Sequence, residues 1–181
     1  FVCDYENGDV GEKKPTVKCV YFTIDANAHI IDFESAENNA VTAFDNMLSD
    51  ASFKKYTDDS KHLFAYAYTK GFEVLGLELD TSLAGYILNP SANAYDPVRL
   101  LSEYGQRVRL KAPHVDSDNE QVQSVMALGV VSDYLLSFID SDNQADLLAM
   151  EISLSEVLAS MEQVGFLVDT DGLSEYGEVI G

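Results

Sequence analysis

The stretch GFEVLGLELDTSLAGYILNP, residues 71–90, decides the fold of this chain. Its mostly apolar run at 74–79 predicts a short, largely buried strand. Asp80 follows at a position typical of a helix N-cap, and Leu83, Tyr86 and Ile87 then fall on one helical face. Asn89-Pro90 ends the helix, because the residue before a proline is disfavoured in the α region. The stretch therefore predicts a strand, a turn and a helix in succession.

The flanking sequence extends this unit into an α/β fold. Apolar and β-branched runs predict strands at 1–6, 16–24, 29–33 and near 52–56, with the second and third forming a hairpin. Helical spacing predicts helices at 35–48, 60–68, 97–104, 120–139, 141–164 and 171–180. Because strands come first and helices later, we expect a mixed sheet covered by helices.

Several helix starts carry recognisable signals. Ser35 and Ser60 are predicted to open helices, and Asp96-Pro97 reads as an N-cap followed by proline at the first helical position. Ser141 and Gln144 fit a capping box. The helix that follows carries apolar residues at intervals of three and four, which we expect to lie in the core or between helices: Leu147, Met150, Leu154, Val157, Met161 and Val164.

Composition and charge narrow the possible classes of protein. With 181 residues and no run of 18 apolar residues, the chain suits a globular protein without a membrane span. It begins at Phe1 with an acidic segment unlike a signal peptide, and we expect it to be a piece of a larger protein. Its net charge is −20, from 31 acidic and 11 basic residues. Since nucleic-acid affinity comes largely from Lys and Arg, this chain alone should bind DNA weakly.

Two smaller features leave alternatives open. Arg99, Arg107, Arg109 and Lys111 form a mild basic cluster that could touch a nucleic-acid backbone or simply be a solvated surface. Cys3 and Cys19 lie in separate strand-like runs and could pair if those strands are neighbours. We favour reduced thiols in a cytoplasmic protein, because disulfides are rare in that compartment.

Residues 71–90 also carry a family resemblance. Their pattern G-[apolar]-E-[apolar]-x-G-x-x-x-D-T-x-L-x-x-Y-[apolar]-L-N-P resembles the 3′–5′ exonuclease-type domain of bacterial family A DNA polymerases, the DNA polymerase I family. A second stretch, EISLSEVLASMEQVGFLVD at 151–169, resembles the segment where that domain runs into the polymerase domain, with Ser153 at the usual place of a proline. The resemblance implies a ribonuclease H-like fold over residues 1–140 and helices beginning the polymerase domain over 141–181.

The resemblance also implies where a nuclease site would lie. Removal of a 3′ nucleotide by the two-metal route needs converging carboxylates, because Mg²⁺ and Mn²⁺ prefer oxygen ligands. Active family members supply them from a D-x-E strand, an aspartate on the helix before residue 71, and a later Y-x-x-x-D helix. Asp4 and Glu6 match the first motif, and strand alternation places both on one face. Leu63 occupies the second position, and residues 126–130, aligned with the third, contain neither tyrosine nor aspartate.

Other polar residues near these positions are poor substitutes. Asp58 and Asp59 lie about one helical turn from position 63, and Asp133 is about three residues out of register. His62 reads as a surface or packing residue rather than a metal ligand. A site with two remaining carboxylates should bind Mg²⁺ weakly, because that ion gives up water reluctantly.

The sequence therefore predicts a vestigial exonuclease domain that braces a polymerase, with no catalytic activity or cofactor of its own. It would contact DNA only as part of the full-length polymerase, and it would pack on the polymerase domain. One alternative is an active exonuclease that uses Mg²⁺ or Mn²⁺ with Asp4, Glu6 and the displaced Asp59 and Asp133. Another is an acidic module that docks a basic protein partner.

Overall fold

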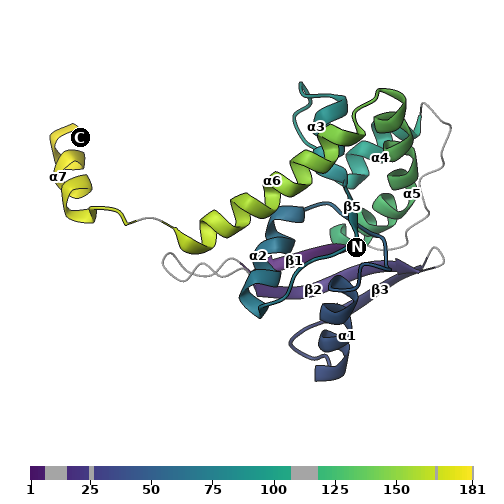
Figure 1. Ribbon diagram of the computed structural model, residues 1–181, viewed down its shortest axis with the longest axis horizontal. Helices are drawn as coiled ribbons and strands as arrows, with labels where there is room; N and C mark the ends of the chain where they lie inside the picture. Colours follow the sequence, from purple (N-terminus) through teal and green to yellow (C-terminus); the bar gives the residue numbers. More distant parts are fainter. Residues whose placement is uncertain (7–15, 25–26, 107–117, 166, 181) are drawn as a thin grey trace.

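A computed structural model describes the chain except for residues 7–15, 25–26, 107–117, 166 and 181. In the described part, three consecutive strands come first, helices then alternate with two further strands, and the C-terminal half is helical (Figure 1). The strands are β1 (Val2–Glu6), β2 (Thr16–Ile24), β3 (Asn27–Asp32), β4 (Lys55–Thr57) and β5 (Leu77–Asp80). The helices are α1 (Asn38–Leu48), α2 (Ser60–Lys70), α3 (Thr81–Leu88), α4 (Pro97–Gly105), α5 (Glu120–Ser141), α6 (Ala145–Val164) and α7 (Thr170–Ile180).

The described strands form two sheets, one antiparallel and one parallel, so the fold contains both kinds of strand pairing. β2 pairs antiparallel with β1 on one side and with β3 on the other, which confirms the hairpin. β4 and β5 pair in parallel. The backbone nitrogen of Phe1 donates to the carbonyl oxygen of Tyr56 at 2.8 Å and so joins β1 to β4. The described strands thus form a three-stranded sheet of order β1-β2-β3 and a two-stranded sheet β4-β5, with this hydrogen bond between them.

Helices cover both faces of the three-stranded sheet. Cys3 and Val20 face α1 and α2, where they share a buried cluster with Leu48 and Leu63. The opposite face packs on α5 through a second cluster of buried residues, Val2, Tyr21, Val125 and Leu128. Gly129 permits this close approach, since a Cβ there would lie 3.0 Å from the Thr23 hydroxyl oxygen.

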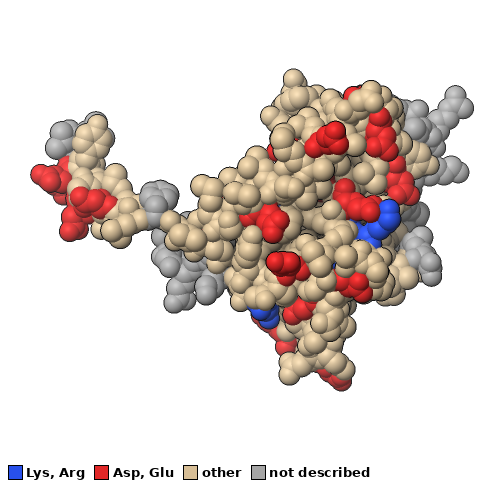
Figure 2. All heavy atoms as spheres, in the orientation of Figure 1, with Lys and Arg blue, Asp and Glu red and all other residues tan. Residues whose placement is uncertain are grey.

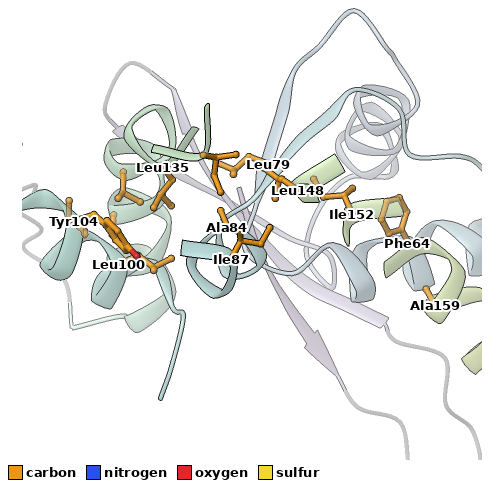
Figure 3. Close-up of a cluster of buried hydrophobic side chains, with 14 of the residues drawn as sticks. Phe64, Leu79, Ala84, Ile87, Leu100, Tyr104, Leu135, Leu148, Ile152 and Ala159 are labelled. Atoms are coloured by element: carbon orange, nitrogen blue, oxygen red, sulfur yellow. The ribbon is translucent and has the colours of Figure 1, made fainter. Parts of the chain in front are cut away.

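The largest cluster joins the helices to the parallel strand β5 (Figure 3). It draws side chains from α2, α3, α4, α5 and α6, including Phe64, Leu79, Ile87, Leu100 and Leu135. α5 has the length and apolar composition of a membrane-crossing helix. Its residues at 125, 128, 131, 135 and 139 are buried against the sheet and the neighbouring helices, which makes it a core helix of this domain.

The apolar stripe of α6 does not lie in the core of the described chain, so of its two expected places only packing between helices stays a prediction. All six stripe residues are exposed, from Leu147 at 37% to Val164 at 87%. The buried face of α6 is instead formed by Leu148, Ile152, Ser155 and Ala159. Ser155 and Ala159 are small, so this face can approach α2 closely; Lys61 of α2 also pairs with Glu162 of α6 at 2.9 Å. A prediction from hydrophobic spacing alone selects the face with the larger apolar side chains, and in α6 that face is the exposed one.

Two predicted helix caps are confirmed and two are wrong. The Asp80 and Asp96 side chains accept hydrogen bonds from the first backbone N–H groups of α3 and α4. Ser35 does not cap α1, because a turn closed by Asp32 takes up residues 32–36 and the helix begins after Glu37. Ser141 ends α5, and its hydroxyl donates to the Phe138 carbonyl rather than capping α6.

Candidate functional site

Asp4 and Glu6 lie on β1, an edge strand of the three-stranded sheet. The backbone of Asp4 is paired with Cys19, and that of Glu6 with Thr16. The neighbours of Asp4 fix its direction: Val2 packs toward α5, whereas Cys3 packs toward α1 and α2. Because side chains alternate along a strand, Asp4 lies on the α5 face. The side chain of Glu6 lies outside the described residues, so the predicted shared face of the two carboxylates stays a prediction.

Leu63 lies on the other face of β1. It is fully buried on α2, among Cys3, Val20 and Tyr66. The helix position that would carry the second carboxylate is thus filled by hydrocarbon in a packed core. Moreover, the side chains of β1 that face this position are Cys3 and Tyr5 rather than Asp4. The backbones of β1 and of the paired strand β2 therefore lie between the Asp4 side chain and position 63.

The third motif falls on α5, which packs over the face that holds Asp4. Within residues 126–130, Met126 and Leu128 pack with Val2 and Tyr21 of the sheet, whereas Ala127 and Val130 pack in the large cluster of the helices. Asp133 follows one turn later and is exposed. Its charge contributes to a raised pKa of Tyr56 on β4, after the larger effect of burial. Asp133 therefore lies over β4, at the edge of the contact between α5 and the sheet.

Asp59 and His62 form a pair at the start of α2. The Asp59 carboxylate accepts a hydrogen bond from the His62 backbone nitrogen at 3.1 Å and lies 2.6 Å from His62 Nδ1. The carboxylate raises the pKa of His62, and hydrogen bonds from His62 lower the pKa of Asp59 against the opposing effect of burial. The Tyr5 ring lies over the imidazole at a centroid distance of 5.3 Å. This bonding makes Asp59 a helix cap and fits the prediction that His62 is a packing residue.

A metal-binding group would need several of these side chains to converge. Within the described part of the chain, no three His, Cys, Asp or Glu side chains gather closely enough to hold a metal ion. Asp4, Asp59 and Asp133 belong to β1, the start of α2 and the outer side of α5, respectively. Among the described side chains, Asp4, Asp59 and Asp133 thus come from three separate elements, and the pairing of Asp4 with Glu6 stays a prediction.

Comparison with known proteins decides the family. Residues 11–122 match the family described as DNA polymerase I, ribonuclease H-like domain. The chain belongs to this family. It is 30% identical to DNA polymerase I of Bacillus subtilis over 143 residues, which is 71% of this chain and 16% of that protein. It is also 30% identical to DNA polymerase I of Geobacillus stearothermophilus over 144 residues, again 16% of the relative.

A solved structure supports the same fold. The POL domain of Pol1 from M. smegmatis, in complex with DNA primer-template and dNTP, superposes with a TM-score of 0.74 at 19% sequence identity. The match covers 96% of this chain and 30% of that chain. The ribonuclease H-like architecture predicted from residues 71–90 is therefore confirmed. The chain spans about one sixth of the length of its bacterial DNA polymerase I relatives.

In this polymerase I domain, Asp80 of the motif at 71–90 has a structural role. It is 3% exposed, and its Oδ1 accepts hydrogen bonds from the backbone nitrogens of Ser82 at 2.9 Å and Leu83 at 3.1 Å. Its Oδ2 accepts from the backbone nitrogen of Ser60 at 2.7 Å. Asp80 thus caps α3 and also binds the first turn of α2. The cap on α3 is predictable from sequence, whereas the link to α2 has no local signal.

Two further groups near the parallel strands are shaped by burial. Burial, with the nearby charges of Asp80 and Asp59, raises the pKa of Asp58 to about 7. Lys55, only 2% exposed, donates from Nζ to the carbonyl oxygens of Asp50, Phe53 and Leu75 at 2.6–2.7 Å. The sequence gives no sign of this buried lysine, because its partners are backbone groups of two separate loops.

The cysteines and the basic cluster are placed only in part. Cys3 and Cys19 are free thiols on neighbouring strands, and their side chains belong to opposite faces of the sheet. Burial raises the pKa of the Cys3 thiol to about 12, which keeps it protonated. Arg99 donates to the Ala94 carbonyl and lies 3.5 Å from Glu103. The other three members of the basic cluster lie outside the described residues.

Proposed function

We propose that this domain belongs to a DNA polymerase that acts in replication and repair, and that its 3′–5′ nuclease site no longer assembles. The observation that carries the proposal is Leu63, which is fully buried in the core at the position matching the second metal-binding aspartate. Restoring a carboxylate there would require burying a charge among Cys3, Val20 and Tyr66, at a cost of several kcal/mol. The nuclease chemistry is therefore lost at a position that the fold itself uses for packing.

The remaining role is structural. The domain would brace the polymerase portion, and α6 is the element suited to transmit this contact, because one of its faces is fixed on α2 and the other is apolar and exposed. DNA would be held through the complete polymerase, since the net charge of −20 opposes phosphate binding by this chain alone. The relative from M. smegmatis was solved with DNA primer-template, which supports this assignment of partner.

A nuclease assay tests the loss of cutting. The chain is incubated with a 3′-labelled single-stranded oligonucleotide and Mn²⁺ or Mg²⁺, and released mononucleotides are counted. We expect the same background for the wild-type chain and for Asp4→Ala. Metal-dependent release that disappears in Asp4→Ala, or in a matched Asp133→Ala variant, would overturn the proposal and restore the two-metal alternative. The variants also control for a contaminating nuclease, whose activity they would leave unchanged.

A further inference from the structure

The exposed stripe of α6 has the geometry of a helix-binding surface. We call its six residues the α6 seam: Leu147, Met150, Leu154, Val157, Met161 and Val164. They recur at intervals of 3-4-3-4-3, which is the a/d spacing of a coiled coil. The seam is about 26 Å long at the rise of an α-helix. An unbroken apolar stripe of this length on a protein surface marks an interaction site.

The seam is held in place by the rest of the domain. On the opposite side of α6, Leu148, Ile152 and Ala159 belong to the large buried cluster shared with α2, α3 and α5. Figure 3 shows Leu148, Ile152 and Ala159 directed into that cluster along α6. A partner therefore meets a helix that is already formed and oriented. A second helix packs on such a surface by interleaving its own side chains, at a shallow crossing angle.

The charges on α6 indicate which kind of helix would bind the α6 seam. The helix contains four acidic residues and neither lysine nor arginine. Glu156 accepts a hydrogen bond from the Tyr68 hydroxyl, and Glu162 pairs with Lys61, so both are engaged with α2. Asp146 and Glu151 instead occupy the g and e positions beside the seam, where charges of a coiled coil meet those of its partner.

The surface around α6 strengthens this selection. Figure 2 shows acidic residues in scattered patches on the visible face and few basic ones. A second copy of this chain would bring the same acidic flank and the same net charge of −20 against it. Like charges across an interface disfavour association, and opposite charges favour it.

We propose that the α6 seam binds an amphipathic helix whose apolar residues recur at 3-4 spacing and are flanked by lysine or arginine. The proposal rests on the bracing role proposed above and specifies which kind of helix the bracing surface binds. It does not depend on the state of the nuclease site, which the nuclease assay tests separately.

The test uses two designed peptides of three heptads. Both carry leucine at every a and d position; one carries lysine at e and g, and its twin carries glutamate there. Binding of each labelled peptide to the folded 181-residue chain is followed by fluorescence anisotropy at low and at high ionic strength. We expect the lysine peptide to bind at least about tenfold more tightly than its twin, with a smaller advantage in salt.

Variants locate the binding surface. The double variant Leu154→Ser/Val157→Ser should weaken lysine-peptide binding by at least about tenfold, because both side chains are exposed anchors at the centre of the seam. Its unchanged thermal melting curve would show that the fold is intact. Glu151→Gln should reduce the preference for the lysine peptide. Tyr86→Ser, which removes a comparably exposed side chain from α3, should leave binding unchanged.

Several results would overturn the proposal. These are no binding of the lysine peptide, equal binding of the two peptides, or binding that the double seam variant does not change. Light scattering measures the oligomeric state of the chain. A dimer that is lost in the double seam variant would identify a second copy of this chain, rather than a basic helix, as the occupant of the seam. None of these results would bear on whether the chain cuts DNA.

Discussion

Asp80 links two helices through one buried carboxylate, and its removal should destabilise the domain more than loss of an ordinary cap. In Asp80→Ala, the first turn of α3 loses its cap, which costs about 1 kcal/mol. The backbone N–H of Ser60 also loses its acceptor in a buried site, which costs a further 1–3 kcal/mol or so. We therefore expect the free energy of unfolding to fall by about 2–4 kcal/mol.

Two comparison variants separate these contributions. Asp96→Ala removes an exposed cap with a single hydrogen bond to Arg99 and should cost about 1 kcal/mol. Asp80→Asn can keep the acceptor for Ser82 and Leu83 but places an amide nitrogen against the Ser60 N–H. Its cost should therefore lie between those of the other two variants.

Urea denaturation followed by far-ultraviolet circular dichroism measures all three variants under one condition. The expected order of destabilisation is Asp80→Ala, then Asp80→Asn, then Asp96→Ala. A loss in Asp80→Ala no greater than that in Asp96→Ala would refute the idea that Asp80 supports two helices.

Three further predictions concern buried groups. Lys55→Met leaves three buried carbonyls without their donor and should cost about 2–4 kcal/mol in urea denaturation, whereas Lys54→Met, which removes an exposed pair with Glu78, should cost less than about 1 kcal/mol. Because the pKa of Asp58 is raised to about 7, the folded state binds the carboxyl proton more tightly than the unfolded state does. The contribution of Asp58 to stability is therefore present below pH 4 and is lost as pH rises to about 7. Asp58→Asn should therefore gain stability over the wild type as pH is raised from 4.5 to 8, and a pH-independent difference would contradict this reasoning. Leu63→Asp should destabilise the fold by about 3 kcal/mol or more without creating nuclease activity, whereas Leu63→Met should cost less than about 1.5 kcal/mol; equal costs in thermal denaturation would contradict the packing account.

The features of the fold that could be predicted from sequence are those with local signals. Asp80 and Asp96 precede helices at positions where a short carboxylate can accept backbone N–H groups, and both act as caps in the structure. The run Thr16–Ile24 is β-branched and aromatic, and it forms β2 with those bounds. Each of these features depends on neighbours within a few residues, so one sequence is sufficient to indicate it.

Features that depend on distant partners could not be predicted in the same way. The α6 seam looks like a core stripe in sequence, but tertiary packing buries the opposite face, where small residues meet α2. The hydrogen bond from Ser60 to Asp80 and that from Lys55 to the Leu75 carbonyl each join residues twenty positions apart. At the candidate site, Leu63 could be identified as a missing carboxylate, but only the structure shows that Asp4 faces the other side of the sheet.

The state of the metal site is the central claim, and Mn²⁺ binding tests it most directly. Mn²⁺ is titrated into the chain and into Asp4→Ala in a buffer without other divalent cations, and bound ions are counted by electron paramagnetic resonance, with the Asp4→Ala titration measuring nonspecific surface binding. The account predicts the same weak, unsaturated binding for both proteins, because β1 separates Asp4 from position 63. Two bound ions per chain that are lost in Asp4→Ala would contradict it and would identify this domain as a working two-metal nuclease.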